Sequence, residues 1–146
     1  MIVAIRRHLV IFARFPQLGR GKRRLAHEIG PVQALRFQRV TLQLIVRRLA
    51  SDPRWATWIA ITPDRSGPWP QGIRLVQQGS GDIGRRMERV ARNLPPGPVV
   101  IVGSDIPGIS AEVIAHAFRA IGDKDAVFGP AEDGGYWLVG LRRRPR

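Results

Sequence analysis

The chain has 146 residues, the size of a single domain, and its apolar content of 44% is enough to build a core. It contains no cysteine, which excludes disulfide bridges, zinc fingers, iron–sulfur clusters and a thiol nucleophile. Lys and Arg outnumber Asp and Glu by 24 to 11, and residues 1–50 alone hold eleven basic residues and only one acid. Such a field favours acidic partners such as phosphate, nucleic acid or an anionic membrane, but it specifies no function.

Nothing at the N-terminus resembles an export signal. The apolar stretch over residues 9–13 ends at Arg14 and is shorter than the core of a signal peptide. No apolar run approaches the roughly 18 residues that cross a bilayer. We therefore expect a cytoplasmic protein without a membrane-spanning segment, unless its basic face binds a membrane surface.

The first third of the chain predicts a strand, a basic loop and a helix. Residues 9–13 are continuously apolar, as in a central strand that is buried on both faces. A glycine-containing basic loop over residues 14–24 leads into a helix that begins near Lys22. Residues 31–50 predict an amphipathic helix packed on a sheet. Its apolar positions are Leu35, Leu42, Ile45, Val46 and Leu49.

The middle of the chain continues the alternation of strands and helices. Residues 55–61 predict a second strand, and a loop rich in Gly and Pro around Trp69 separates it from a short extended segment at residues 73–77. Residues 82–93 predict a helix. The apolar face of this helix is expected to comprise Ile83, Met87 and Val90.

The last third predicts three strands and a helix. Residues 99–102 form another buried apolar run, and Ser110 is placed to cap a helix that extends to Ile121. Two further strands are expected at residues 125–128 and 136–141. The whole order predicts one α/β domain over residues 1–146, a three-layer sandwich with a mainly parallel sheet, whose ligand crevice lies beyond the carboxyl ends of the strands.

The loop over residues 14–24 has the composition of a phosphate site. Gly19 and Gly21 allow close backbone approach, the helix that follows begins with unpaired N–H groups, and Lys22 and Arg24 add positive charge. The loop is not a Walker A motif, because Arg23 occupies the position of the required hydroxyl residue. A solvated basic loop explains the same composition equally well.

Acidic residues follow two of the predicted strands. Asp105 comes directly after the buried run at residues 99–102, where a carboxylate is well placed to hold Mg²⁺ together with nucleotide phosphates. The alternative is a cap on the following N–H groups. Glu132 and Asp133 precede Gly134 and Gly135, and such paired glycines before a strand indicate either a ligand passing close by or an ordinary tight turn.

Other candidate residues have simpler explanations. The three histidines show no metal-ligand spacing, so we expect all of them to be structural or on the surface. Trp55, Trp58 and Trp137 lie in predicted strands and are expected in the core. Trp69 can stack on a base or sugar, although packing of its loop is the more common use. The glycines at 79, 81 and 84 are compatible with a flexible entry into a helix.

Four segments together resemble a known family. Residues 15–26, 78–87, 102–108 and 129–140 are similar, in order and spacing, to the bacterial glycosyltransferase-A-like proteins known as radical-SAM/selenodomain-associated transferases, within the nucleotide-diphospho-sugar transferases. This group lies near the guanylyltransferases that build cofactor F420 and molybdenum cofactor dinucleotides. The resemblance covers almost the whole chain and implies a glycosyltransferase-A fold.

The resemblance also implies roles for particular residues. Lys22 and Arg24, with Gly19 in the same loop, are expected to bind the phosphates of a nucleoside triphosphate or nucleotide-sugar. Asp105 is expected to hold Mg²⁺ or Mn²⁺ and to be catalytic together with Asp133. Gly134 and Gly135 are expected to line the side of the second substrate.

The chain departs from the family pattern at two levels. Arg23 and Arg85 stand where relatives usually have a Thr-like residue and an acid, which makes this site more basic. Family members also continue for several tens of residues beyond the position of Arg146, so the resemblance implies that the C-terminal part of the fold is missing, and with it a possible further acidic residue.

Three functions therefore remain open from the sequence. The first is a metal-dependent, glycosyltransferase-like enzyme that uses a nucleotide or nucleotide-sugar, with nucleotidyl transfer of the cofactor guanylyltransferase type as the alternative chemistry. The second is a basic nucleic-acid-binding protein, which the neutral C-terminal third and the lack of a basic-aromatic motif disfavour. The third is an inactive fold retained for partner binding. The acceptor, the base preference and the oligomeric state are not encoded in any motif.

Overall fold

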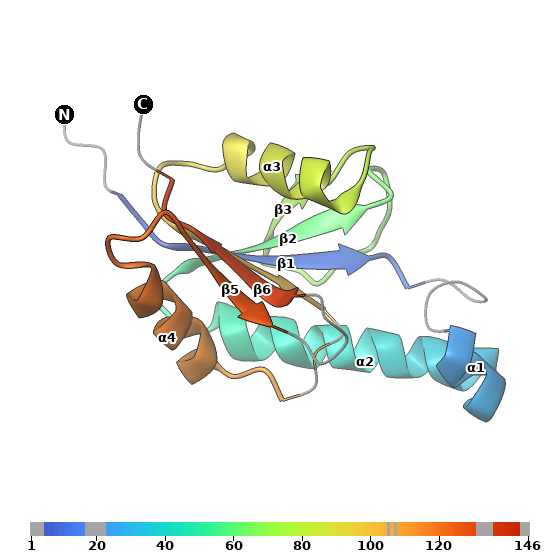
Figure 1. The fold of residues 1–146 in the computed structure, drawn as a ribbon. Coiled ribbons are helices and arrows are strands. Elements are labelled where there is room, and N and C mark those ends of the chain that lie inside the picture. Colours follow the sequence, from blue (N-terminus) through green and yellow to red (C-terminus); the bar gives the residue numbers. More distant parts are fainter. Residues whose placement is uncertain (1–4, 17–22, 105, 107, 131–135, 144–146) are drawn as a thin grey trace.

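The computed structural model describes residues 5–16, 23–104, 106, 108–130 and 136–143 (Figure 1). All the predicted strands and helices are present in this part of the chain. The elements are β1 (His8–Arg14), α1 (Arg23–Ile29), α2 (Pro31–Ala50), β2 (Ala56–Thr62), β3 (Arg74–Gln77), α3 (Ile83–Asn93), β4 (Val99–Gly103), α4 (Ala111–Ile121), β5 (Ala126–Pro130) and β6 (Tyr136–Leu141).

The strands form one six-stranded sheet in the order β3-β2-β1-β4-β6-β5. Strand β1 is parallel to β2 and β4, and β2 is parallel to β3. Strand β6 is antiparallel to both β4 and β5. The sheet is therefore mainly parallel, as the alternation of strands and helices predicts.

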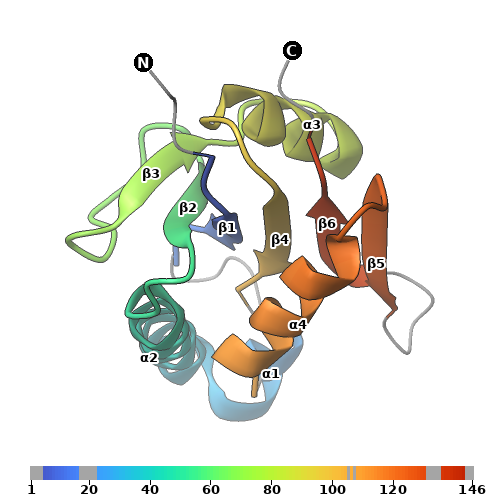
Figure 2. The ribbon, with the colours of Figure 1, turned by 90° about the vertical axis from the view of Figure 1, so that its left-hand side faces the viewer.

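Helices cover both faces of the sheet, which gives the molecule three layers (Figure 2). Successive residues of β1 point to opposite faces, so Leu9 and Ile11 join the core beneath α2 and α4, while Val10 joins the core beneath α3. All three side chains are fully buried. The prediction of a central strand buried on both faces is confirmed.

Side-chain contacts fix the helices on the sheet. Trp55 is buried, donates from Nε1 to the carbonyl of Leu49 at 3.0 Å, and stacks on Phe118 at 5.8 Å between ring centroids, so one indole joins α2 to α4. Ser110 caps α4, because its Oγ accepts from the N–H of Val113 at 3.2 Å. The predicted cap is confirmed.

The predicted core is wrong at Ile83. Ile83 is 61% exposed rather than packed inward, since it occupies the first turn of α3, which begins at the edge of the sheet and has no strand to cover. Trp58 and Trp137, also predicted in the core, are partly buried and pack against it. Trp137 lies over Gly129, where an added Cβ would come within 2.9 Å of the indole, so this glycine makes room for the ring.

Candidate functional site

The carboxyl ends of the parallel strands meet at one edge of the sheet. The registers pair Arg14 of β1 with Thr62 of β2, and Ile61 of β2 with Gln77 of β3. Gly103 of β4 pairs with Phe12 close to the same edge. In a sheet of this kind the ligand crevice lies outside these strand ends. We refer to this edge, with the loops that leave it, as the carboxyl edge.

A buried amide ties three elements together at the carboxyl edge. The side chain of Gln78 is 4% exposed, and its Nε2 donates to the carbonyl of Ala60 at 2.8 Å and to that of Ala13 at 3.4 Å. Its Oε1 accepts from a guanidinium nitrogen of Arg86 at 3.3 Å. All the polar atoms of this amide therefore have partners, which a buried polar group requires. The ends of β1 and β2 are thereby held against α3.

Two arginines of α3 hold the loop that follows Gln78. Arg89 donates to the carbonyls of Gln78 at 2.6 Å and Ser80 at 2.8 Å, and Arg86 donates from Nε to the carbonyl of Gly81 at 2.8 Å. Guanidinium donors make strong hydrogen bonds of this kind because the donor is charged. The segment from Gln78 to Asp82, which we call the glycine loop, is therefore fixed by specific contacts and is not a flexible entry into the helix.

The backbone of the glycine loop requires its glycines. Gly79 and Gly81 adopt φ values of +75° and +104°, a region that side chains disfavour. A Cβ at Gly79 would also lie 2.4 Å from a guanidinium nitrogen of Arg89. Asp82 then caps α3 through its Oδ1, which accepts from the N–H of Arg85 at 2.9 Å.

A second loop of the carboxyl edge packs on the segment after β1. Trp69 is 8% exposed, and its ring meets that of Phe15 edge-on at 5.3 Å, while its Nε1 donates to Ser66 Oγ at 3.1 Å. Trp69 therefore packs its own loop, as expected for the more common use of such a residue. Beside it lies a pocket of about 430 Å³, lined also by Leu42 and Arg39 of α2.

Most of the residues singled out from the sequence lie outside the described residues. These are Gly19, Lys22, Asp105, Asp133, Gly134 and Gly135, whereas Arg24 belongs to α1 but only its backbone is described. Their described neighbours in the chain are placed at the carboxyl edge. Arg14 ends β1 and Phe15 follows it, Ser104 follows β4, and Pro130 of β5 pairs with Tyr136 of β6. The roles of these residues stay predictions.

The described acids at this edge already have backbone partners. Asp64 accepts from the N–H of Gly79 at 3.1 Å, and Asp82 is the α3 cap. Within the described ranges, no cluster of three or more His, Asp or Glu side chains could hold a metal ion.

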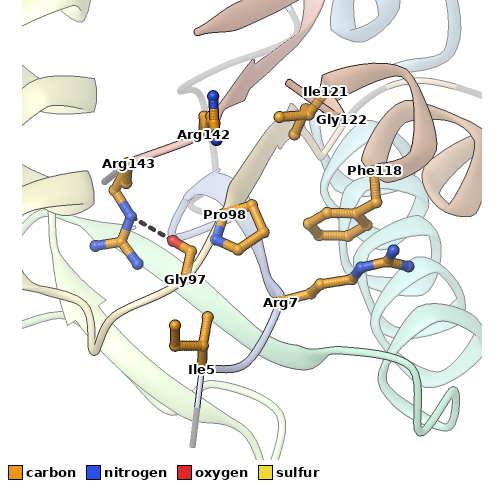
Figure 3. Close-up of a pocket in the computed structure, with 9 residues that line it drawn as sticks. All are labelled: Ile5, Arg7, Gly97, Pro98, Phe118, Ile121, Gly122, Arg142 and Arg143. Atoms are coloured by element: carbon orange, nitrogen blue, oxygen red, sulfur yellow. Dashed lines mark hydrogen bonds between the residues drawn. The ribbon is translucent and has the colours of Figure 1, made fainter. Parts of the chain in front are cut away.

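A pocket of about 310 Å³ lies at the edge of the sheet opposite to the carboxyl edge (Figure 3). Arg7, Arg142 and Arg143 are among the residues that line it. Its arginines make contacts within the fold. The Arg143 guanidinium donates to the carbonyls of Gly97 at 2.8 Å and Leu94 at 3.1 Å, and also to those of Ala91 and Pro95, so it closes the end of α3. Arg7 lies over the ring of Phe118 at 5.4 Å. These contacts give the edge a structural role.

His8 lies near this pocket and is 3% exposed. Its Nδ1 accepts from Trp58 Nε1 at 3.2 Å, and its Nε2 is 3.3 Å from the carbonyl of Pro96, an arrangement that suits a neutral ring with the proton on Nε2. Burial lowers the pKa of His8, and the nearby Arg143 lowers it further. Among the described residues, His27 and His116 are exposed, so the structural or surface role expected of all three histidines is confirmed.

Sequence reasoning missed Gln78, Arg86 and Arg89 as the framework of the site. The available signal was a polar residue directly after the predicted strand at 73–77, followed in the next helix by two arginines three positions apart. That spacing places both arginines on one face of a helix, where they can hold the loop before it.

The chain was compared with protein families, curated proteins and solved structures. No curated protein matches the chain. A solved structure from Desulfovibrio desulfuricans G20, provisionally named a nucleotide-diphospho-sugar transferase, matches 95% of this chain at 29% identity with a TM-score of 0.84. The chain spans 64% of the length of that protein.

Two cytidylyl enzymes match at lower identity. CMP:2-keto-3-deoxy-manno-octonic acid synthetase, solved with CTP, is 11% identical over 94% of this chain and 74% of its own, with a TM-score of 0.54. The 4-diphosphocytidyl-2C-methyl-D-erythritol synthase of Anaerococcus prevotii DSM 20548 is 13% identical over 94% and 70%, with a TM-score of 0.56. These likenesses show that the fold is shared. The Desulfovibrio structure, together with the six-stranded sheet, confirms the predicted fold class of nucleotide-diphospho-sugar transferases.

The family is given by the sequence match. A family model described as an uncharacterized protein conserved in bacteria, DUF2064, matches residues 35–146, which is most of the chain. The expected relation to nucleotide-diphospho-sugar transferases agrees with the Desulfovibrio structure, whereas the association with radical-SAM proteins stays a prediction. The chain belongs to the DUF2064 family.

Proposed function

We propose that the carboxyl edge binds a nucleoside triphosphate or nucleotide-sugar and that this chain carries the nucleotide-binding part of a metal-dependent transferase. The observation that carries the proposal is the fixed glycine loop at the same edge where the basic segment after β1 begins. The similarity to the Desulfovibrio protein supports the transferase class. The cytidylyl enzymes of like fold, one solved with CTP, support a nucleotide as ligand.

In this proposal the basic segment after β1 neutralises phosphate. Lys22 and Arg24 bind the phosphate oxygens, and the glycine at 19 allows the backbone to approach them. The N-terminal third supplies the long-range field, since residues 1–50 hold eleven basic residues and one acid. Positive charge placed beforehand stabilises the negative charge that develops on the leaving phosphate.

Asp105 fits a divalent cation at this edge. The apolar run of β4 is buried as far as Val102, and the strand ends at Gly103, two positions before Asp105 in the sequence. Asp64 and Asp82, two described acids at this edge, already accept from backbone N–H groups, and Asp105 is the acid that the resemblance assigns to this role. Mg²⁺ or Mn²⁺ needs only one or two protein carboxylates when nucleotide phosphates complete its shell, and it would supply Lewis-acid polarisation of those phosphates.

Asp133, with Gly134 and Gly135, lies between β5 and β6 and is proposed to line the side of the second substrate. A carboxylate there orients an acceptor hydroxyl and takes up its proton as the new bond forms. Attack on the α-phosphorus of a nucleoside triphosphate breaks its bond to the bridging oxygen, expels pyrophosphate and gives nucleotidyl transfer. Attack on the anomeric carbon of a nucleotide-sugar breaks its bond to the phosphate oxygen, expels the nucleotide and gives glycosyl transfer. The roles proposed for Lys22, Asp105 and Asp133 serve either reaction.

The proposal is tested by a thermal-shift screen of nucleoside triphosphates and nucleotide-sugars with Mg²⁺, followed by affinity measurements on Lys22→Ala. Loss of a charge-assisted hydrogen bond should weaken nucleotide binding by about 1–3 kcal/mol while leaving the melting temperature without nucleotide unchanged. Lys124→Ala, an exposed lysine between α4 and β5, is the matched control and should bind as wild type. Equal affinity of both variants, or no nucleotide binding at all, would reject the proposal.

A further inference from the structure

Helix α2 is apolar on two sides. Leu42, Ile45, Val46 and Leu49 are buried against the sheet. On the outer side, Phe37, Val40 and Leu44 follow one another at spacings of three and four residues, which places them on one face of the helix. They are 45%, 48% and 53% exposed, and we call this row the outer stripe.

The surroundings of the outer stripe are basic. Arg36 and Arg47 lie eleven residues apart, three turns of helix, so both flank the stripe on the same side. Arg39 and Arg48 are also exposed on α2, and Arg48 reaches across to the carbonyl of Ile109 at 3.1 Å. The helix contains no acidic residue along its 20 positions. Its outer side therefore combines an apolar row with positive charge that no acid of the helix itself neutralises.

Helix α2 lies at the outside of the described part of the fold. The helix runs along the outside of one face of the sheet, with α1 at one end and α4 beside it (Figures 1 and 2). None of the helices in the described part of the chain is long and apolar enough to cross a membrane. A contact made by α2 would therefore lie along a surface.

We propose that the outer side of α2 binds the surface of an anionic lipid bilayer, with the outer stripe immersed among the headgroups and the flanking arginines on lipid phosphates. Basic amphipathic helices bind membranes in this way, through buried apolar area and attraction to anionic lipids together. Nucleic acid fits the surface less well. Arginine attracts the phosphates of nucleic acid, but the apolar side chains of Val40 and Leu44 would not be buried by contact with phosphates and would remain in water. This inference is independent of the nucleotide site.

The proposal is tested by co-sedimentation with vesicles of phosphatidylcholine containing phosphatidylserine, compared with phosphatidylcholine alone. Wild type should bind only the anionic vesicles. Arg36→Gln with Arg47→Gln should weaken binding by about fivefold for each arginine removed. Val40→Ser with Leu44→Ser should weaken it by about tenfold or more, because the apolar area is lost while the charge is unchanged.

Matched variants separate this surface from the overall charge of the protein. Arg92→Gln with Arg119→Gln removes the same charge from exposed positions of α3 and α4, and Ile83→Ser with Val113→Ser removes exposed apolar area from the same two helices. Both controls should bind as wild type. Circular dichroism verifies that every variant is folded.

Each other outcome overturns the proposal. Absence of binding to anionic vesicles would overturn it. So would an equal loss of vesicle binding in Arg36→Gln with Arg47→Gln and in the control Arg92→Gln with Arg119→Gln, because the protein would then be attracted by its net charge alone. If the stripe variant bound vesicles as wild type, the apolar row would have no part in the contact. Tight binding of duplex DNA that the stripe variant retains, without vesicle binding, would identify a nucleic-acid surface instead.

Discussion

Replacing Gly79 with Ala tests whether the arginines of α3 hold the glycine loop. The substitution places a Cβ at a φ of +75°, which costs about 1 kcal/mol for a residue other than glycine. The same Cβ would lie 2.4 Å from a guanidinium nitrogen of Arg89 and would displace it from the carbonyls of Gln78 and Ser80. A hydrogen bond to a charged group contributes about 1.5–3 kcal/mol. With the backbone cost and the loss of one such bond, the expected loss of unfolding free energy is about 2.5–4 kcal/mol.

Gly72 provides a matched control for the backbone cost. It has a φ of +80°, but an added Cβ there meets nothing within 4 Å, so Gly72→Ala should lose only about 1 kcal/mol. Urea unfolding gives both free energies. The difference between the two variants should vanish when each is made in an Arg89→Gln background, because the contact that Gly79→Ala breaks is then already absent. Equal losses for Gly79→Ala and Gly72→Ala in the wild-type background would refute the role of Arg89.

Two further predictions concern the opposite edge of the sheet. Burial lowers the pKa of His8 from its ordinary value of 6.5, so the unfolded chain binds the proton more tightly, and stability should be full above about pH 6.5 and fall as pH drops below it. His8→Gln should flatten this dependence when urea unfolding is measured over about pH 5 to 7.5, and an unchanged slope would assign it to other groups. Arg143→Gln should lose about 2–3 kcal/mol, since the carbonyls at the end of α3 lose a charged donor. A loss below about 0.5 kcal/mol would show that water satisfies those carbonyls equally well.

The sequence predicts a strand correctly wherever every residue of that strand is apolar and buried. The runs over 9–13 and 99–102 are apolar at every position, and a strand covered by helices on both faces needs that pattern. Pairing between distant strands is not encoded locally, so the antiparallel direction of β6 was not predicted. Ile83 was misassigned because periodicity identifies a helix face without showing where the sheet beneath it ends.

The framework of the site was less predictable for a similar reason. Gln78 contacts Ala13, which lies 65 residues earlier in the chain, and only the folded sheet brings the two together. Arg86 and Arg89 were visible merely as charges on a basic helix, where solvated arginines are the ordinary case. The roles of Asp105 and Lys22 still depend on the resemblance of their segments and on the described residues that flank them.

The most direct test of the account measures Mg²⁺-dependent stabilisation by nucleotide in wild type and in Asp105→Asn. With nucleotide at about 100 times its dissociation constant, wild type should gain about 2.7 kcal/mol of stability in the presence of Mg²⁺. Asp105→Asn keeps the shape of the side chain and removes its charge, so it should lose the Mg²⁺-dependent part of the gain and remain folded. Asp123→Asn, at an exposed position after α4, should behave as wild type. An Mg²⁺-dependent gain that is the same in wild type and Asp105→Asn would contradict a metal role for Asp105, and no gain in wild type with any nucleotide would contradict the proposed function.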